Sequence, residues 1–363
     1  MFPLIEFPAF IVYEMTYLMP KDITRSLQLT GARTYLVSLP REWIERNGLE
    51  AKDEIGIRIE NETYLLLYPR NPRLTPRKTT TIPESESIEL ELLSRYITGF
   101  DTMVVYPSEG KKIKDPDKIR EEIRHQIGLE IIRESPNQLE IQFIATSVLD
   151  LQTLVRKIYA LSFSMLDDAI SAIFSGDGEK REKIVKRYSE IDRVYYFIVR
   201  LLQKSFEDPL EEINESLYPF EGLNYQIVAY QGEVLGRSCK ELAERIGKFQ
   251  KSFLTTETES MVREIAEKLI ELLDTAIEAF LNKDTEKAAI TVKEVKTKKY
   301  QVQPLLAIIS EEAADEPTWF LARLLSSLLE QADQVCYLTD IVTRGFNALH
   351  EYDAKQYLES ELT

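Results

Sequence analysis

Five polar side chains near the start of the chain have the types and the spacing to contact a nucleic acid: Arg25, Gln28, Thr30, Arg33 and Arg41. Arginine carries a permanent charge and a planar fork of N–H donors, so it can bind phosphate oxygens or the edge of a guanine. Arg25, Thr30 and Arg33 flank Gly31, which has the backbone freedom of a joint between strands. We predict these five residues to face DNA. Salt bridging is the alternative for Arg33 and for Arg41, which stands four residues before Glu45.

A hairpin and a short helix are the first elements that must position these side chains. Residues 26–29 and 34–39 have the composition of two short strands. Pro40 then opens a helix, because a proline in the first helical turn loses no hydrogen bond, and Ser38 is close enough to cap it. Trp43 follows on the inward face of that helix, so we expect it in the core rather than stacked on a base.

A second hairpin completes this segment. Asn47-Gly48 is typical of a left-handed cap at the end of the helix. Two further strands are predicted over residues 54–59 and 63–68, with a turn at 60–62. A unit of this size buries too little of its own chain to be stable alone. We therefore expect it to dimerise.

The ordered positions of residues 25–69 resemble the SpoVT/AbrB swapped-hairpin family. The resemblance is carried by Gln28-Leu29-Thr30-Gly31, Ser38-Leu39-Pro40, Trp43, Gly48-Leu49 and Lys52-Asp53-Glu54. It implies that the hairpins of two chains interleave into one barrel, which presents arginines on its strands and loops to DNA. Among the candidate residues, the resemblance supports Arg25 and Arg33 most.

The distribution of charge sets the same segment apart. The whole chain has a formal net charge of -16, yet residues 21–78 hold 11 Lys and Arg against 8 Asp and Glu. Residues 1–20 carry -2, which leaves -17 for the remainder of the chain. A locally basic surface favours contact with phosphates, because each phosphate that a Lys or Arg neutralises releases condensed counterions. A chance excess of three charges is the alternative.

The remaining composition is that of a soluble chain in a reducing compartment. Its 44% hydrophobic and 29% charged residues are ordinary for globular domains. Cys239 and Cys336 lie in helical patterns without metal spacing, so we predict buried thiols and a cytoplasmic location. Residues 1–20 are apolar, but Glu6, Glu14 and two prolines interrupt them. We expect a loose extension or a misassigned start, not a signal peptide or a membrane span.

A linker and a small α/β segment follow the first domain, which we place at residues 21–72. Residues 70–78 are rich in proline and positive charge and are predicted to be the linker. Residues 80–146 are predicted to form an α/β connector that offers no chemistry. Its expected helices cover 87–99 and 116–126, and its expected strands cover 102–106, 129–133 and 139–144.

From residue 148 onward the pattern changes to long helices that fall into two similar halves. Each half has a break after its first helix, at Asp177 and at Asp284, and these breaks are 107 residues apart. Apolar residues from Ile184 to Leu202 alternate four and three positions apart, as a packing seam between helices requires. We predict two antiparallel three-helix bundles, over residues 148–250 and 255–355.

The break at Asp177 and one run in the second helix resemble the PhoU family of phosphate-uptake regulators. The run is Tyr188-Ser-Glu-Ile-Asp192-Arg193-Val-Tyr-Tyr-Phe-Ile-Val-Arg200. Members of that family are paired three-helix bundles that act with phosphate transporters and sensor kinases. The resemblance therefore implies a transporter or sensor component as a partner, without membrane insertion. A swapped-hairpin module ahead of such bundles resembles archaeal phosphate uptake regulators as a class.

The metal signature that the PhoU resemblance implies is damaged in this chain. That signature is an acidic residue and an aspartate four positions apart, which share a helical face and suit a hard or borderline metal. In the first half the best register gives Glu233 and Arg237. In the second half either register, at Glu330 or at Asp333, lacks one carboxylate. Salt-bridged helix faces are the favoured interpretation, and a divalent transition metal is the alternative.

The sequence predicts no catalytic site. His125 and His350 fall in separate domains, and neither has an acidic or hydroxyl grouping around it, so both are expected on the surface. The chain contains no Walker loop, dinucleotide fingerprint, HExxH pair or nucleophile elbow. We therefore do not expect an enzyme.

The predicted fold is multidomain α+β: a small swapped-hairpin β-barrel module, a small α/β connector and two PhoU-like antiparallel three-helix bundles. The leading hypothesis is a cytoplasmic homodimer that binds DNA and regulates transcription for phosphate uptake and phosphate homeostasis. The first alternative is a PhoU-type interaction scaffold that does not bind DNA and regulates a phosphate transporter or sensor kinase. A second alternative, an antitoxin-like module, fits poorly with so large a helical body.

Overall fold

Two units make up the chain, Met1–Arg77 and Lys78–Thr363, in the computed structural model of the protein. The residues described are 23–31, 34–59, 65–70, 78–108, 110, 112–144, 150–175, 178–207, 219–246, 256–312, 319, 321–337 and 339–340. Several predicted features lie outside the described residues: the extension 1–20, Arg33, the turn at 60–62, Asp177 and His350.

The first unit contains the predicted order of hairpin, helix and hairpin. Strands β1 (Gln28–Thr30) and β2 (Thr34–Leu36) pair antiparallel, helix α2 covers Arg41–Arg46, and β3 (Ile55–Ile59) pairs antiparallel with β4 (Leu65–Pro69). Among the described residues the two hairpins form separate two-stranded sheets. The small β region is thus present, whereas closure into a barrel is not shown within one chain.

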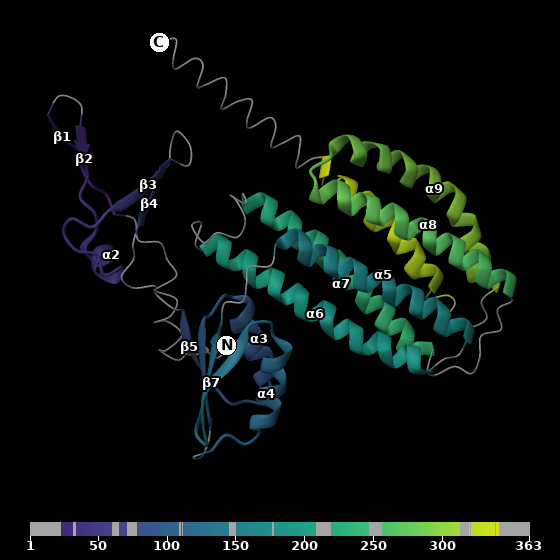
Figure 1. The fold of residues 1–363 in the computed structure, drawn as a ribbon, viewed down its shortest axis with the longest axis horizontal. Coiled ribbons are helices and arrows are strands. Elements are labelled where there is room, and N and C mark those ends of the chain that lie inside the picture. Colours follow the sequence, from purple (N-terminus) through teal and green to yellow (C-terminus); the bar gives the residue numbers. More distant parts are fainter. Residues whose placement is uncertain are drawn as a thin grey trace, which may run out of the picture. The chain divides into compact units, whose positions relative to one another are not determined.

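The second unit begins with the α/β connector, in which two helices pack on one four-stranded sheet (Figure 1). The sheet order is β5-β6-β8-β7, in which β5 lies parallel to β6 and the other neighbours are antiparallel. The elements in chain order are β5 (Thr79–Pro83), α3 (Ile88–Ile97), β6 (Thr102–Tyr106), α4 (Pro116–His125), β7 (Leu129–Ser135) and β8 (Gln138–Phe143).

Strand β5 corrects the sequence analysis, which assigned no strand ahead of the first connector helix. Its sequence is Thr79-Thr-Thr-Ile-Pro83, and only Ile82 is fully buried. A strand that ends in proline and lies at the edge of a sheet gives a weak alternating pattern of apolar residues, because one of its two hydrogen-bonding edges has no neighbouring strand. Helix α4 was located correctly because Asp115 caps it, with its carboxylate accepting from the Lys118 N–H at 3.1 Å.

Three long helices follow and pack against one another as an antiparallel bundle (Figure 1). They are α5 (Leu151–Ser175), α6 (Gly178–Glu207) and α7 (Pro219–Ile246). Helix α5 is long and apolar enough to cross a membrane by length and composition alone. Many of its apolar side chains, among them Ile158, Met165 and Ala169, are fully buried in the core. Helix α5 is therefore the core helix of the bundle.

The second helical half contains α8 (Thr256–Leu281), α9 (Thr285–Glu312) and the helical residues 321–337. Residues 321–337 bury Leu321, Leu325, Leu328 and Val335 in the core that they share with α8 and α9. The two halves are joined across α5 and α8, where Arg156 binds Glu278 with two hydrogen bonds of 2.7 and 3.1 Å. Six helices in two groups thus account for the described part of the helical region.

Candidate functional site

Helix α2 is short, and its two ends differ in how they are held. Its C-terminus is closed as predicted: Gly48 has φ +61°, the Gly48 N–H donates to Glu45 O and the Leu49 N–H donates to Ile44 O. This pair of bonds is the Schellman arrangement, which only a residue free to adopt a left-handed conformation completes without strain. The predicted Ser38 cap is wrong, since Pro40 occupies the N-cap and no side chain bonds there.

Three of the predicted DNA-facing residues, Arg25, Gln28 and Thr30, are exposed in or next to the first hairpin. Gln28 stands opposite Leu36 in the strand register, and Arg25 donates to the neighbouring Thr24 carbonyl at 3.2 Å. The Thr30 hydroxyl donates to Thr34 O at 3.3 Å and so helps to close the hairpin. Arg33 is outside the described residues. The arrangement leaves the Arg25 guanidinium at the surface, where it can reach a phosphate.

Gly31 is the joint between β1 and β2, as the sequence predicts. Its φ of +73° lies in the left-handed region, and an added Cβ would meet no heavy atom within 4 Å. The space around Gly31 is therefore open, and glycine is required there by the backbone conformation alone. An open, left-handed turn of this kind lets another backbone approach closely.

Arg41 forms the salt bridge that the sequence analysis gave as its alternative role. Its Nε lies 2.7 Å from Glu45 Oε1, and the two side chains are 89% and 60% exposed. An exposed pair at this spacing contributes only about 0.3–0.5 kcal/mol. A phosphate could therefore replace Glu45 as the partner of Arg41 at little cost. Trp43 is half-buried, and Leu49, which follows the helix, is buried.

The hairpins of the first unit expose large apolar side chains. They are between 50% and 74% exposed, which is far more than a folded core permits. The residues are Leu27, Leu29, Tyr35, Leu36, Val37, Ile57, Ile59 and Leu65. Among the described residues each hairpin is a separate two-stranded sheet, whose edges can pair with a second chain.

The helical domain contains a buried carboxylate at the position of the damaged metal signature. Glu233 is 4% exposed, accepts from the Tyr188 hydroxyl at 2.7 Å and binds Arg237 Nη2 at 2.9 Å. Burial raises the pKa of Glu233, and Arg237 opposes that rise. No group of three His, Cys, Asp or Glu suited to a metal occurs in the described part of the chain. Because a guanidinium occupies one side of Glu233, these residues do not fit a metal ion.

His125 is not the isolated surface residue that the sequence suggested. Its Nε2 lies 3.3 Å from Asp192 Oδ2, its Nδ1 lies 3.3 Å from Ser189 Oγ, and its backbone carbonyl accepts from Arg193 Nε at 3.0 Å. The hydrogen bond to Asp192 raises the pKa of His125. These partners lie on α6, more than 60 residues away along the chain. His125, Ser189 and Arg193 line a polar groove of about 470 Å³ between α4 and α6.

The contacts between the connector and α6 left no signal in the sequence. His125 meets Asp192, and a second group joins Arg200 and Lys204 of α6 to Asp101 of the connector. All of these residues are charged and stand in ordinary amphipathic patterns. Their pairing depends on the tertiary packing of α3 and α4 against α6, which a single sequence does not specify.

Two family models match separate parts of the chain. Residues 28–75 match the family described as antidote-toxin recognition MazE, bacterial antitoxin, and residues 155–246 match the PhoU domain. The chain carries an N-terminal MazE/AbrB-type antitoxin domain and a C-terminal PhoU domain. Both belong to regulatory families that are not enzymes.

Solved structures similar to this chain are PhoU proteins. PhoU from Pseudomonas aeruginosa is 14% identical and aligns over 54% of this chain and 96% of its own, with a TM-score of 0.45. The phosphate transport system regulatory protein PhoU from Streptococcus pneumoniae is also 14% identical, over 54% and 95% of the two chains, with a TM-score of 0.44. No curated protein matches the chain. Residues 76–154, which include the connector, lie between the two family matches.

Proposed function

We propose that this protein is a cytoplasmic, homodimeric transcriptional regulator of phosphate uptake and phosphate homeostasis. In this proposal the MazE/AbrB-type domains of two chains interleave into one barrel that binds operator DNA. The PhoU domain receives the phosphate-status signal, through a phosphate transporter or sensor component. The observation that carries the proposal is the joint presence of a MazE/AbrB-type domain and a PhoU domain in one chain, in which residues 21–78 hold 11 Lys and Arg against 8 Asp and Glu although the whole chain has a net charge of -16.

Two features of the first unit support dimerisation and DNA contact. Its hairpins expose large apolar side chains that a second copy would cover. Its candidate contact residues Arg25, Gln28, Thr30 and Arg41 are all exposed, and Arg33 completes the proposed set. Arginines of this kind anchor a protein on phosphates and, where they reach a groove, read guanine.

The proposal is tested by fluorescence anisotropy with a labelled duplex taken from upstream of phosphate-transport genes, over a series of salt concentrations. We expect binding whose affinity falls with salt, because each phosphate contact releases counterions. The double variant Arg25→Ala, Arg33→Ala should lower affinity and flatten the salt slope by about 0.9 for each phosphate that the variant no longer neutralises. Arg133→Ala is the matched control, since Arg133 is an exposed arginine of the connector.

The rival function is an interaction scaffold in which the first domain only dimerises the chain. It is favoured by the net charge of -17 beyond residue 78 and by the existing partner of Arg41. Sedimentation of the double variant separates the two functions. A regulator loses DNA binding and stays dimeric, whereas a scaffold shows no salt-sensitive binding to DNA even in the wild type.

A further inference from the structure

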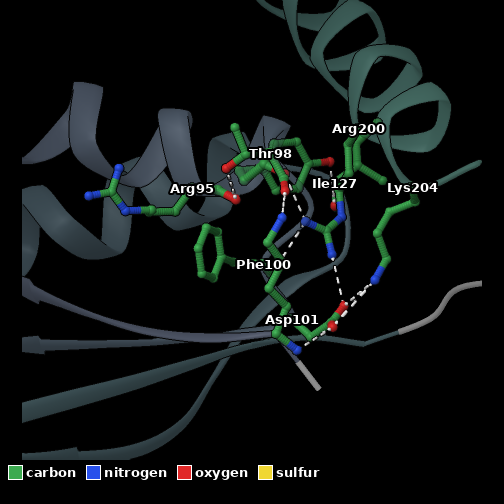
Figure 2. A network of polar contacts seen from close by, with 9 residues as sticks. Arg95, Thr98, Phe100, Asp101, Ile127, Arg200 and Lys204 are labelled. Atoms are coloured by element: carbon green, nitrogen blue, oxygen red, sulfur yellow. Dashed lines mark hydrogen bonds and ion pairs between the residues drawn. The ribbon is translucent and has the colours of Figure 1, made fainter. Parts of the chain in front are cut away.

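A fully buried arginine joins the PhoU domain to the connector. Arg200 lies on α6 and its side chain is 1% exposed. Its Nη1 donates to the backbone carbonyls of Tyr96 at 2.7 Å and Phe100 at 2.9 Å, and its Nη2 lies 3.3 Å from Asp101 Oδ1 (Figure 2). Helix α6 thus inserts one charged side chain into the turn that links α3 to β6.

The surroundings of Arg200 exclude water and leave the guanidinium dependent on its protein partners. Its Cζ lies 4.0 Å from the centre of the Phe143 ring and 5.2 Å from that of the Tyr96 ring. Taking a cation out of water is costly unless charge and hydrogen bonds replace the lost hydration. Two carbonyls, one carboxylate and two ring faces supply that replacement. Withdrawing any of these partners therefore destabilises the contact as a whole.

Asp101 is the point at which three segments of the chain meet. Its carboxylate binds Arg200 and also Lys204 of α6, whose Nζ lies 3.3 Å from Oδ1. The same carboxylate accepts from the backbone N–H of Lys78 through Oδ2 at 2.9 Å. The Asp101 N–H returns a bond to the Lys78 carbonyl at 2.8 Å, and Lys78 Nζ donates to Thr98 O at 2.7 Å. These bonds hold Lys78 at both its backbone and its side chain.

Lys78 is the residue at which the chain enters the second unit from the first. Arg200 and Lys204 belong to the segment that matches the PhoU domain, whereas Asp101 and Lys78 lie outside both family matches. One PhoU helix thus carries two cations that bind Asp101, and the same carboxylate binds Lys78, where the second unit begins. The apolar cores of the connector and the bundle are also continuous, so apolar packing as well as charge connects the bundle to the connector.

We propose that Asp101 is a joint through which helix α6 of the PhoU domain holds the root of the N-terminal domain at Lys78. A movement of α6 that withdraws Arg200 and Lys204 weakens the hold of Asp101 on Lys78 and loosens the tether of the N-terminal domain. In the regulator proposed above, on which this role of the joint rests, a change in the PhoU domain reaches the DNA-binding domain by this route.

Hydrogen exchange of the full chain, followed by mass spectrometry with overlapping peptides across residues 74–84, tests the joint. Arg200→Met keeps much of the side-chain volume and removes the charge and the donors. We expect it to raise the exchange rate of the Lys78 amide at least tenfold, while peptides of α5 and α7 keep wild-type rates. Arg187→Met is the matched control, because Arg187 is another arginine of α6 but binds Asp168 and Ser164 inside the bundle.

A second variant covers the case in which Arg200→Met unfolds the connector. Lys204→Met removes one cation from Asp101 and leaves Arg200 in place, so we expect exchange at Lys78 to rise several-fold with unchanged rates in β6 and β8. Wild-type exchange at Lys78 in both variants, or an equal rise in Arg187→Met, overturns the joint. The exchange measurement contains no DNA, so it tests the joint without testing DNA binding. If the expected exchange pattern is found but the protein does not bind operator DNA, only the proposed function is contradicted.

Discussion

Two glycines in α7 determine how closely that helix approaches its neighbours, and their replacement by alanine should have unequal costs. A Cβ at Gly232 would lie 2.6 Å from Ile158 Cγ2 and 3.1 Å from the Tyr159 ring. A Cβ at Gly236 would lie 2.5 Å from Ile191 Cδ1. Both distances are shorter than van der Waals contact, so in each variant an atom of a fully buried isoleucine must move.

The two isoleucine atoms differ in their freedom. Cγ2 of Ile158 is attached to Cβ, and it moves only if χ1 changes or the helices separate, whereas Cδ1 of Ile191 turns about χ2. Overpacking a core costs about 1–3 kcal/mol, and replacing a helical glycine by alanine recovers about 1 kcal/mol. We expect Gly232→Ala to destabilise the bundle by about 1–2 kcal/mol and Gly236→Ala by about 0–1 kcal/mol.

A double-mutant cycle isolates the contact between residues 236 and 191. Ile191→Val removes Cδ1 and alone should cost about 0.5–1.5 kcal/mol, because it leaves a small cavity. With Gly236→Ala added, the new methyl group fills that space, and the pair should show a favourable coupling of about 1 kcal/mol. Urea titration by circular dichroism, with hydrogen exchange of α5 and α7 peptides, measures these values. Additive effects of the two substitutions, or a greater cost for Gly236→Ala than for Gly232→Ala, would refute this packing of α7.

Three further predictions concern charge and backbone conformation. The hydrogen bond to Asp192 raises the pKa of His125, so the contact between them stabilises the fold most below about pH 6.5 and weakens as pH rises through the raised pKa. The variant His125→Gln should remove this pH dependence from the midpoint of urea unfolding. Burial raises the pKa of Glu233, and Arg237 lowers it again, so Arg237→Met leaves the charged carboxylate destabilised. The free energy of unfolding of this variant should fall by about 1–2 kcal/mol between about pH 5 and 8 in the same assay. Gly48→Ala should cost about 1 kcal/mol of first-unit stability, because of its φ of +61°, in thermal unfolding followed by tryptophan fluorescence.

The elements that the sequence located well are those whose signals are local. The left-handed cap at Gly48 and the Asp115 cap of α4 are read from two or three adjacent residues, and both are present in the structure. The long helices follow from an apolar period that persists over many turns. Strand β5 was missed because Thr79–Pro83 offers one buried residue and ends in proline, so neither periodicity nor composition identifies it.

The candidate sites divide in the same way between local and tertiary signals. The pairing of Arg41 with Glu45 and of Glu233 with Arg237 is predicted by spacing along one helix, and both pairs form. The pairing of His125 with Asp192 and of Asp101 with Arg200 spans 67 and 99 residues. No pattern in one sequence selects these partners among 61 acidic and 45 basic residues, because the choice is made by the packing of connector and bundle.

The two units differ in how their cores are completed, and this difference bears on regulation. The second unit buries a continuous apolar core within one chain. The first unit leaves Leu29, Tyr35 and Ile59 more than half exposed, and in the proposed homodimer a second chain covers them. If that chain is another copy, mass action makes the folded state of the N-terminal domain depend on concentration. If the PhoU domains join the two chains, they raise the effective concentration of the hairpins, and if they separate the chains, they lower it. The amount of barrel available to bind DNA then changes in the same direction.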